Sequence, residues 1–325
     1  METQEQKDLI KNTIEQAKLN GILKYLPNGE LTHAPFSLSP YAMPESVFEK
    51  MAELTVPFNE LMIKVSRNTD FLIHHLEPIA AIDPFLKMLL KCRSKEINQN
   101  CQLLIQRNDF FIANVKHNDY KQNTTPTNEI TEESVLRQVE LNTVSASFPF
   151  LITRLYQLHK NLFEQNKLPK VIQNNPLDAV VDAFAHSVQN YGISDSVILV
   201  VVQSNEKNIF DQIGLQQQLW KKHKIATVRK TLFEIYKDGK LRQGHLVVDE
   251  KTVALTYYRA GYTPDDFPEK EAFKGRQLIE ASSTIQVPDM GMQLSGMKKI
   301  QQVLTKKEVL ADFVTEEISR RFLKT

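Results

Sequence analysis

Apolar residues in the first hundred positions recur at the three- and four-residue spacing of amphipathic helices. One such stripe runs from Leu9 to Ala17 through Ile10 and Ile14. A second helix is predicted from Asp83-Pro84, because aspartate caps a helix well and proline suits the first helical position. We therefore expect a helix-rich N-terminal region. The second stripe consists of Phe85, Leu86, Leu89 and Leu90, followed by Lys91 and Arg93 where the helix dipole favours positive charge.

The apolar spacing changes shortly after position 100 and indicates two short strands. A turn is expected between them at Arg107-Asn108-Asp109. The polar residues 116–134, which include a proline, predict a surface loop. The two strands are marked by Leu103 and Ile105, and by Phe110 and Ile112.

Residues 138–147 alternate like a strand and then become small and polar. The alternation places Val139 and Leu141 on one face, and Gln138, Glu140 and Asn142 on the other. Glu140 and Asn142 are about 7 Å apart along their face, and both offer the hard oxygen atoms that magnesium takes. The simpler alternative, from this pattern alone, is a strand edge that runs into a polar turn.

Two more helices precede a region of α/β character. The first carries Leu151, Leu155, Leu158 and Leu162. The second begins at Asn175-Pro176, carries Leu177, Val180, Phe184 and Val188, and stops before Gly192. The continuous apolar run 197–203 is typical of a strand covered on both faces.

A helix over residues 209–221 and a strand near 225–231 complete one βαβ unit with that run. Ligands collect at the carboxyl ends of such strands, and Glu206 and Asn208 fall at this position. Residues 245–248 and 252–258 are spaced as a hairpin.

The C-terminal region predicts helices over residues 292–304 and 305–323, the second with a capping box of Thr305 and Glu308. An apolar stripe on the second helix has no later segment of this chain to pack on. It either packs backwards onto earlier helices, meets a partner, or belongs to a longer protein. The stripe is formed by Val309, Leu310, Phe313, Val314, Ile318 and Phe322.

Charge and composition exclude several classes of protein. The 325 residues carry 40 basic and 39 acidic side chains, a net charge of +1, so no overall field favours nucleic acid or an anionic membrane. The N-terminus lacks the apolar core of a signal peptide, and the run 197–202 is too short to span a bilayer. The two cysteines, Cys92 and Cys101, suit a reduced cytoplasmic protein and are expected to be packing residues.

Familiar catalytic motifs are missing from the sequence. It has no CxxC, HExxH or GxSxG pattern. The paired His74-His75 lies in a helical context and is expected to be structural. Residues 291–299 nearly match a phosphate-binding loop, but Met297 follows Gly296, and no Ser or Thr follows Lys298 to hold magnesium.

Polar residues at predicted strand ends remain as candidates. Arginine suits bidentate recognition of carboxylate or phosphate groups. The simpler interpretation of each arginine, taken singly, is an ordinary surface ion pair. Taken together, these side chains fit a site for a polar, multiply anionic ligand with a metal. The set comprises Arg107, Asp109, Glu140, Asn142, Ser145, Ser147, Glu206, Asn208, Gln212, Arg259, Gly261 and Tyr262.

At these residues the chain resembles the eukaryotic type of glutathione synthetase, an ATP-grasp ligase that joins glycine to γ-glutamylcysteine. The similarity runs in order along nearly the whole chain, and the pattern E-x-N-T-x-S-A-S-F is its most specific part. The similar segments are residues 34–36, 107–109, 138–148, 208–212, 258–262, 288–289 and 293–299.

The resemblance implies a role for each matching residue. Glu140 and Asn142 would bind Mg²⁺, with Glu140 also near the nucleotide, and Lys298 would contact ATP from a helix. Arg107 would hold an anionic group of γ-glutamylcysteine. The rest of that substrate pocket would comprise Val144, Ser145, Ala146, Ser147, Glu206, Lys207, Asn208, Gln212, Arg259, Ala260, Gly261 and Tyr262.

The resemblance also implies an α/β fold of the ATP-grasp type. Residues 1–192 would form the N-terminal part of the body, 193–294 an inserted α/β substrate-binding domain, and 295–325 a return to the body. The reaction implied is acyl phosphate formation from ATP, followed by attack of the glycine amine. A cytoplasmic homodimer is expected, with no nucleic acid or membrane partner.

The chain departs from the family pattern in three respects. Phe110 replaces a common tyrosine, and Ala260 stands where aspartate is usual. The family also continues past residue 325 with a glycine-rich loop, further ATP lysines, another magnesium carboxylate and the arginine for glycine. We therefore expect the chain to represent the N-terminal two-thirds and to be inactive alone. The alternative is a non-catalytic protein that binds γ-glutamylcysteine or glutathione, or a regulatory partner.

Overall fold

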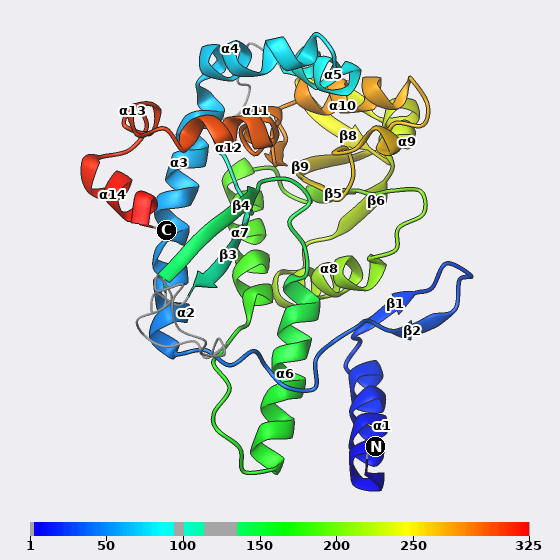
Figure 1. Ribbon diagram of the computed structural model, residues 1–325. Helices are drawn as coiled ribbons and strands as arrows, with labels where there is room; N and C mark the ends of the chain where they lie inside the picture. The colour runs from blue at the N-terminus through cyan, green and yellow to red at the C-terminus, as the bar shows by residue number, and fades with distance from the viewer. Residues whose placement is uncertain (1–2, 94–100, 114–134, 325) are drawn as a thin grey trace.

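The computed structural model describes residues 3–93, 101–113 and 135–324 (Figure 1). The predicted surface loop 116–134 lies outside these residues. Within the described part, no helix is both long and apolar enough to cross a membrane. The mixed α/β architecture predicted from the sequence is confirmed.

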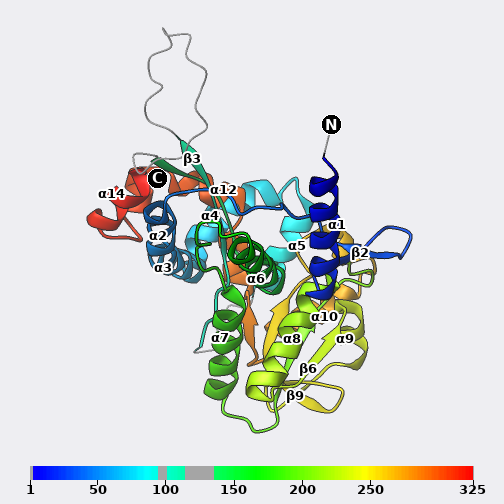
Figure 2. The same ribbon diagram turned by 90° about the horizontal axis from the view of Figure 1, so that it is seen from below.

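A six-stranded sheet occupies one side of the molecule (Figure 2). Its long strand β9 pairs with β5 on one side, and with β8 and β10 in succession on the other. Strands β5, β6 and β10 run parallel to β9, so their carboxyl ends lie along one edge. The strands are β5 (Val197–Val201), β6 (Thr227–Lys230), β7 (Lys240–Arg242), β8 (His245–Val248), β9 (Lys251–Tyr258) and β10 (Ile285–Val287).

Helices cover both faces of this sheet because its strands are apolar on both sides. All five residues of β5 are buried; Ile198 and Val200 face one set of helices, and the alternating Leu199 faces the other. The first set is α6 (Pro149–Gln165), α7 (Pro176–Tyr191) and α8 (Ile209–His223), and the second is α9 (Leu232–Asp238) and α10 (Ala272–Glu280). A short 3-10 helix, η2 (Pro264–Asp266), precedes α10.

A helical body with its own core adjoins the sheet (Figure 1). It combines early and late segments of the chain with an antiparallel ribbon of two strands. The ribbon is β3 (Arg107–Ala113) and β4 (Val135–Asn142). The helices are α2 (Glu45–Glu53), α3 (Thr55–Arg67), α4 (Thr69–Ala80), α5 (Pro84–Cys92), α11 (Met290–Ser295), α12 (Lys298–Leu304), α13 (Lys307–Leu310) and α14 (Glu316–Lys324).

The N-terminal arm consists of α1 (Gln4–Leu19) and a hairpin of β1 (Leu23–Tyr25) and β2 (Leu31–His33). It packs on α6 through a small cluster of Ala17, Ile22, Leu158 and Leu162. Of its predicted stripe, Ala17 is buried, whereas Leu9 is 48% exposed.

Several local predictions are confirmed. Asp83 accepts hydrogen bonds from the backbone N–H groups of Phe85 and Leu86 and so caps α5. The β5–α8–β6 unit is present, and Gly192 ends α7 in the left-handed conformation. Asp249 and Glu250 form the two-residue turn between β8 and β9, both with positive φ, as favoured hairpin turns require.

The expected packing role of the cysteines agrees with their surroundings. Cys92 is buried in the helical core, and burial raises the pKa of its thiol to about 12. Cys101 is partly buried against the core between the sheet and α6–α8. Neither cysteine is part of a disulfide.

The prediction of a turn at residues 107–109 was wrong. Arg107, Asn108 and Asp109 begin a single strand, β3, which pairs with β4. The apolar residues Leu103 and Ile105 precede it without regular structure and pack against the core of the sheet. The strand depends on a partner about 30 positions later, so local spacing could not identify it.

The long C-terminal helices were also predicted wrongly. Residues 290–324 form four short helices, and Thr305 ends α12 rather than capping a following helix. The apolar stripe packs backwards, one of the alternatives considered. Phe313 lies edge-on to Phe71 of α4, with ring centroids 5.0 Å apart, and Phe322 stacks on Phe58 of α3 at 4.2 Å.

Candidate functional site

The β3–β4 ribbon gathers charged side chains at one end. Arg107 is paired with Asn142, and Asp109 with Glu140. Arg107 donates to both carboxylate oxygens of Asp109, at 2.8 and 2.9 Å, and its Nη2 lies 3.4 Å from Glu140 Oε1. Asn142 Nδ2 donates to the same Glu140 oxygen at 2.9 Å. Glu140 and Asn142 therefore share a face of the strand, as the alternation predicted.

A β-bulge corrects the other half of that prediction. The register shifts between Asp109 and Phe110, so Val139 has no partner in the pairing. Val139 is 51% exposed, whereas Leu141 is 3% exposed. The two residues do not share a buried face because the extra residue reverses the alternation between them.

The Glu140 carboxylate also accepts a hydrogen bond from the Lys298 ammonium group. This hydrogen bond, followed by that from Asn142, lowers the pKa of the Glu140 carboxyl to about 2. Arg107 adds a smaller electrostatic contribution. Glu140 is thus ionised at neutral pH, as a carboxylate that binds a cation must be.

Helix α12 is fixed against the ribbon by Gln301. The Gln301 side chain accepts from the backbone N–H of Leu141 and donates to its carbonyl, each at 2.9 Å. Thr143 Oγ1 donates to the carbonyl of Met292 at 2.7 Å. A Cβ on Gly296 would lie 2.2 Å from that hydroxyl oxygen, so only glycine fits here. Lys298, the first residue of α12, therefore faces Glu140 from a helix rather than from a phosphate-binding loop.

The loop after β4 is held by Arg259, which follows β9 at the edge of the sheet. Its Nη1 donates to the carbonyl and hydroxyl oxygens of Ser145, at 2.7 and 3.0 Å, and to the Ala146 carbonyl at 3.2 Å. The Tyr257 hydroxyl donates to the same Ala146 carbonyl. Ser145 has a φ of 52°, a strained conformation that these bonds compensate.

Asp211 in the first turn of α8 holds the other end of this loop. Its carboxylate accepts from the backbone N–H groups of Phe148, Phe150 and Leu151, at 2.9 to 3.2 Å. Burial raises the pKa of Asp211, and these hydrogen bonds oppose the rise. The loop 143–148 is thereby clamped from both sides.

A second loop is shaped by Asp266 at the carboxyl edge of the sheet. Asp266 Oδ2 accepts from three successive backbone N–H groups, those of residues 261–263, at 2.9 to 3.1 Å. Gln293 Nε2 donates to the Gly261 carbonyl at 2.8 Å. In the loop between the neighbouring strand β5 and helix α8, Glu206 Oε1 accepts from the backbone N–H of Asn208 at 2.8 Å.

The predicted site residues thus fall into two groups joined by the loop 143–148. Lys207 is exposed, and Tyr262 is 37% exposed, whereas Gln212 and Ala260 are each 2% exposed. Ala260 packs into the core beside α9 and α10. The first group is Arg107, Glu140, Asn142 and Lys298, and the second is Val144, Ser145, Ala146, Ser147, Glu206, Lys207, Asn208, Gln212, Arg259, Ala260, Gly261 and Tyr262.

Sequence reasoning missed the residues that position this site. Asp211 lies in segment 208–212, which resembles the family, but nothing in the sequence indicated its role as a hydrogen-bond acceptor for loop 143–148. Nothing in the sequence distinguished Gln301 from other glutamines. Asp266 could have been found, because Thr263-Pro264-Asp265-Asp266 has the spacing of a capping box, which the structure contains.

The side chains around Glu140 offer a metal ion only a few ligands. Among the described residues, no group of three or more His, Cys, Asp or Glu side chains could hold one. Glu140 and Asn142 supply only two oxygen-bearing side chains. That number suits Mg²⁺, which is commonly bound by one or two carboxylates together with waters and substrate phosphates. The site therefore fits a magnesium ion brought with a nucleotide.

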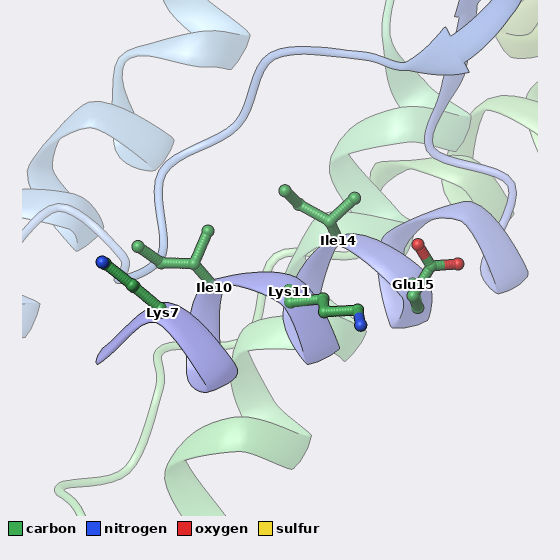
Figure 3. Close-up of a pocket in the computed structure, with 5 residues that line it drawn as sticks. All are labelled: Lys7, Ile10, Lys11, Ile14 and Glu15. Carbon is green, nitrogen blue, oxygen red and sulfur yellow. The ribbon is translucent and has the colours of Figure 1, made fainter. Parts of the chain in front are cut away.

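A hollow on the N-terminal helix α1 lies outside the elements that carry these residues (Figure 3). Its lining comes entirely from this helix: Lys7, Ile10, Lys11, Ile14 and Glu15. Ile10 and Ile14 lie side by side, one helical turn apart. The hollow has no convergent polar groups of the kind that the loop 143–148 and the sheet edge provide.

Comparison with known proteins identifies the family. Residues 3–325 match the family model described as eukaryotic glutathione synthase, ATP binding domain. The chain is 36% identical over 303 residues to a chloroplastic glutathione synthetase of Solanum lycopersicum, covering 89% of this chain and 52% of that protein. It is 35% identical over 321 residues to the glutathione synthetase of Dictyostelium discoideum, covering 94% and 63% respectively.

The fold has a solved counterpart in a glutathione synthetase like-effector, GSS30, of Globodera pallida. The TM-score is 0.79 and the identity 19%, with all of this chain and 71% of that chain covered. The chain spans about half to two-thirds of the length of the curated relatives it matches. From the match to residues 3–325, the chain belongs to the eukaryotic glutathione synthase family.

Proposed function

We propose that the chain provides the γ-glutamylcysteine site and part of the Mg–ATP site of a glutathione synthetase. The observation that carries this proposal is the loop 143–148. It begins beside the ionised Glu140 and is held by Arg259 at the carboxyl edge of the sheet. A peptide bound along this loop would have one end at the sheet and the other near the nucleotide.

At the nucleotide end, Glu140 and Asn142 would hold Mg²⁺ and Lys298 would neutralise phosphate charge. Bound magnesium would supply charge stabilisation for phosphoryl transfer. In this structure the Lys298 ammonium group donates a hydrogen bond to the Glu140 carboxylate. When nucleotide binds, we expect Lys298 to exchange that contact for a phosphate oxygen.

Arg107, beside Glu140, and the residues around loops 143–148 and 259–262 would bind γ-glutamylcysteine. Their work is to orient its cysteinyl carboxylate toward ATP. An oxygen of that carboxylate would attack the γ-phosphorus and release ADP. The glycine amine would then attack the acyl carbon and release phosphate. No enzyme nucleophile is required.

We further propose that the α/β region 193–294 is the substrate-binding domain, and that segments 1–192 and 295–325 form the body. The core that α12 and α13 share with α3 and α4 supports the assignment of 295–325 to the body. A homodimer in a reducing, cytoplasmic setting completes the proposal, and two cysteines outside any disulfide agree with that setting.

Calorimetric titration with γ-glutamylcysteine tests the peptide site. We expect saturable binding near one ligand per chain, and weaker binding of the isomer with an α-glutamyl linkage. Arg259→Ala should reduce affinity at least tenfold, because loop 143–148 loses its clamp. The matched control is Arg242→Ala, which removes an exposed arginine paired with Glu250. Equal binding of both isomers, or an unaffected Arg259→Ala variant, would contradict the proposal.

The nucleotide end is tested by ATP affinity measured with and without Mg²⁺. Glu140→Ala should abolish the increase in affinity that Mg²⁺ gives, while leaving γ-glutamylcysteine binding within about threefold. Glu250→Ala, which removes another ion-paired carboxylate on the surface, is the control. If Glu140→Ala retains the full magnesium effect, the metal assignment fails.

A further inference from the structure

Arg229 lies at the carboxyl edge of the sheet and is absent from the predicted site. It is the second-last residue of β6, in register with Val200 of β5. Its neighbour Val228 packs in the core beside α9 and α10. Because side chains alternate along a strand, Arg229 faces the side of the sheet that α6–α8 cover. Loop 143–148 leads into α6 on this side.

The Arg229 guanidinium has unused hydrogen-bonding capacity. Its Nη1 is buried, yet it has no hydrogen-bond partner in the described part of the chain. Arg259 at the same edge also has a buried atom without a partner in the described residues, its Nε, but its Nη1 is engaged with Ser145 and Ala146. An anion that took the Arg259 Nη1 would compete with loop 143–148, whereas the Arg229 Nη1 holds no loop.

Gln212 presents a second set of unpaired buried atoms at the same edge. It lies in the first turn of α8 and is 2% exposed, and neither atom of its amide has a partner among the described residues. Native proteins pair nearly all such buried atoms. Unpaired donors and acceptors on two elements at one edge indicate a polar ligand that completes them.

The surrounding charges indicate the chemistry of that ligand. Burial is the main cause that lowers the pKa of Arg229; the charge of Glu206 opposes this shift, and the charge of Arg259 adds to it. A carboxylate and a guanidinium therefore act on one another where β5 and β6 end. Such a pair complements a zwitterion, with the carboxylate receiving an ammonium group and the guanidinium a carboxylate.

We propose that Arg229 is a further substrate-positioning residue that binds the α-carboxylate of the γ-glutamyl group, with Glu206 receiving its α-ammonium group. This inference rests on the proposed function. The reacting cysteinyl carboxylate has to approach Glu140 and Lys298. The opposite, zwitterionic end of the peptide is then the one that reaches the sheet edge, with the Gln212 amide beside it.

The test compares two ligands by calorimetry: γ-glutamylcysteine, and 4-aminobutanoyl-cysteine, which lacks the α-carboxylate. Arg229→Gln should weaken γ-glutamylcysteine binding roughly 10- to 100-fold, the loss of a charge-assisted hydrogen bond. It should change binding of 4-aminobutanoyl-cysteine less than twofold. Arg229→Lys, which keeps the charge but not the fork, should give a smaller loss of the same selectivity. Arg242→Gln is the matched control.

The outcomes separate the two proposals. If wild-type protein binds γ-glutamylcysteine and Arg229→Gln binds it equally well, this inference is wrong and the proposed function stands. Equal loss of both ligands would show a merely structural role and would also overturn the inference. If wild-type protein binds neither ligand, both proposals fail.

Discussion

Glu140 connects three segments that are distant in sequence. Arg107 contacts it from β3, Asn142 from its own strand β4, and Lys298 from α12. Each of these contacts favours the ionised carboxylate, so the arrangement is stable only while Glu140 is charged. We call Glu140 together with Arg107, Asn142 and Lys298 the Glu140 cluster. The low pKa of Glu140 is the property that tests whether this cluster forms.

The titration of Glu140 follows from this arrangement. Because the folded pKa is depressed from 4.5 to about 2, the contribution of the cluster to stability is present above pH 4.5 and is lost as the pH falls through about 2. Carboxyl NMR should give a midpoint near 2 for Glu140. Lys298→Ala should raise it most and Asn142→Ala less, while Glu250 is unchanged. A midpoint near 4.5 in the wild type would contradict this account.

The elements that position the site owe their geometry to tertiary contacts. The bulge in the ribbon leaves Glu140 and Asn142 together while Val139 turns to solvent. Gln301 then pairs with Leu141 as a further strand would. The short helices α11 and α12 meet at Gly296, where Thr143 comes too close for any larger residue.

This dependence explains what the sequence could predict. The α5 cap at Asp83, the βαβ unit and the β8–β9 hairpin follow from neighbouring residues, and the sequence predicted them. Strand β3 and the breaks between α11 and α14 depend on distant partners, and local periodicity gave wrong elements. For the site, spacing suggested Glu140 and Asn142 as a pair, but it contained nothing that pointed to Arg229 or Gln301.

Replacing Gly296 tests the fit between α12 and the ribbon. Gly296→Ala should destabilise folding by about 1–3 kcal/mol through overpacking against Thr143. Adding Thr143→Ala should recover part of this loss, since it removes the crowded hydroxyl. Urea unfolding of both single variants and the double variant gives the coupling energy. Strictly additive effects would show that Thr143 is not the obstacle.

At the level of the whole molecule, the site spans two packed bodies. Lys298 and Glu140 belong to the helical body, whereas Arg229, Glu206 and Arg259 lie at or just beyond the strand ends of the sheet. The loop 143–148 crosses from one to the other, clamped by Arg259 and Asp211. Under the proposed function, this position between the bodies would let one bound peptide reach both the sheet edge and the proposed nucleotide end.

Hydrogen–deuterium exchange with and without γ-glutamylcysteine tests this claim most directly. The account predicts that ligand slows exchange together in residues 143–148, 206–212 and 259–263, while α1 and the β7–β8 hairpin are unchanged. Protection confined to α1 or to any other single element, or no protection at saturating ligand, would contradict it.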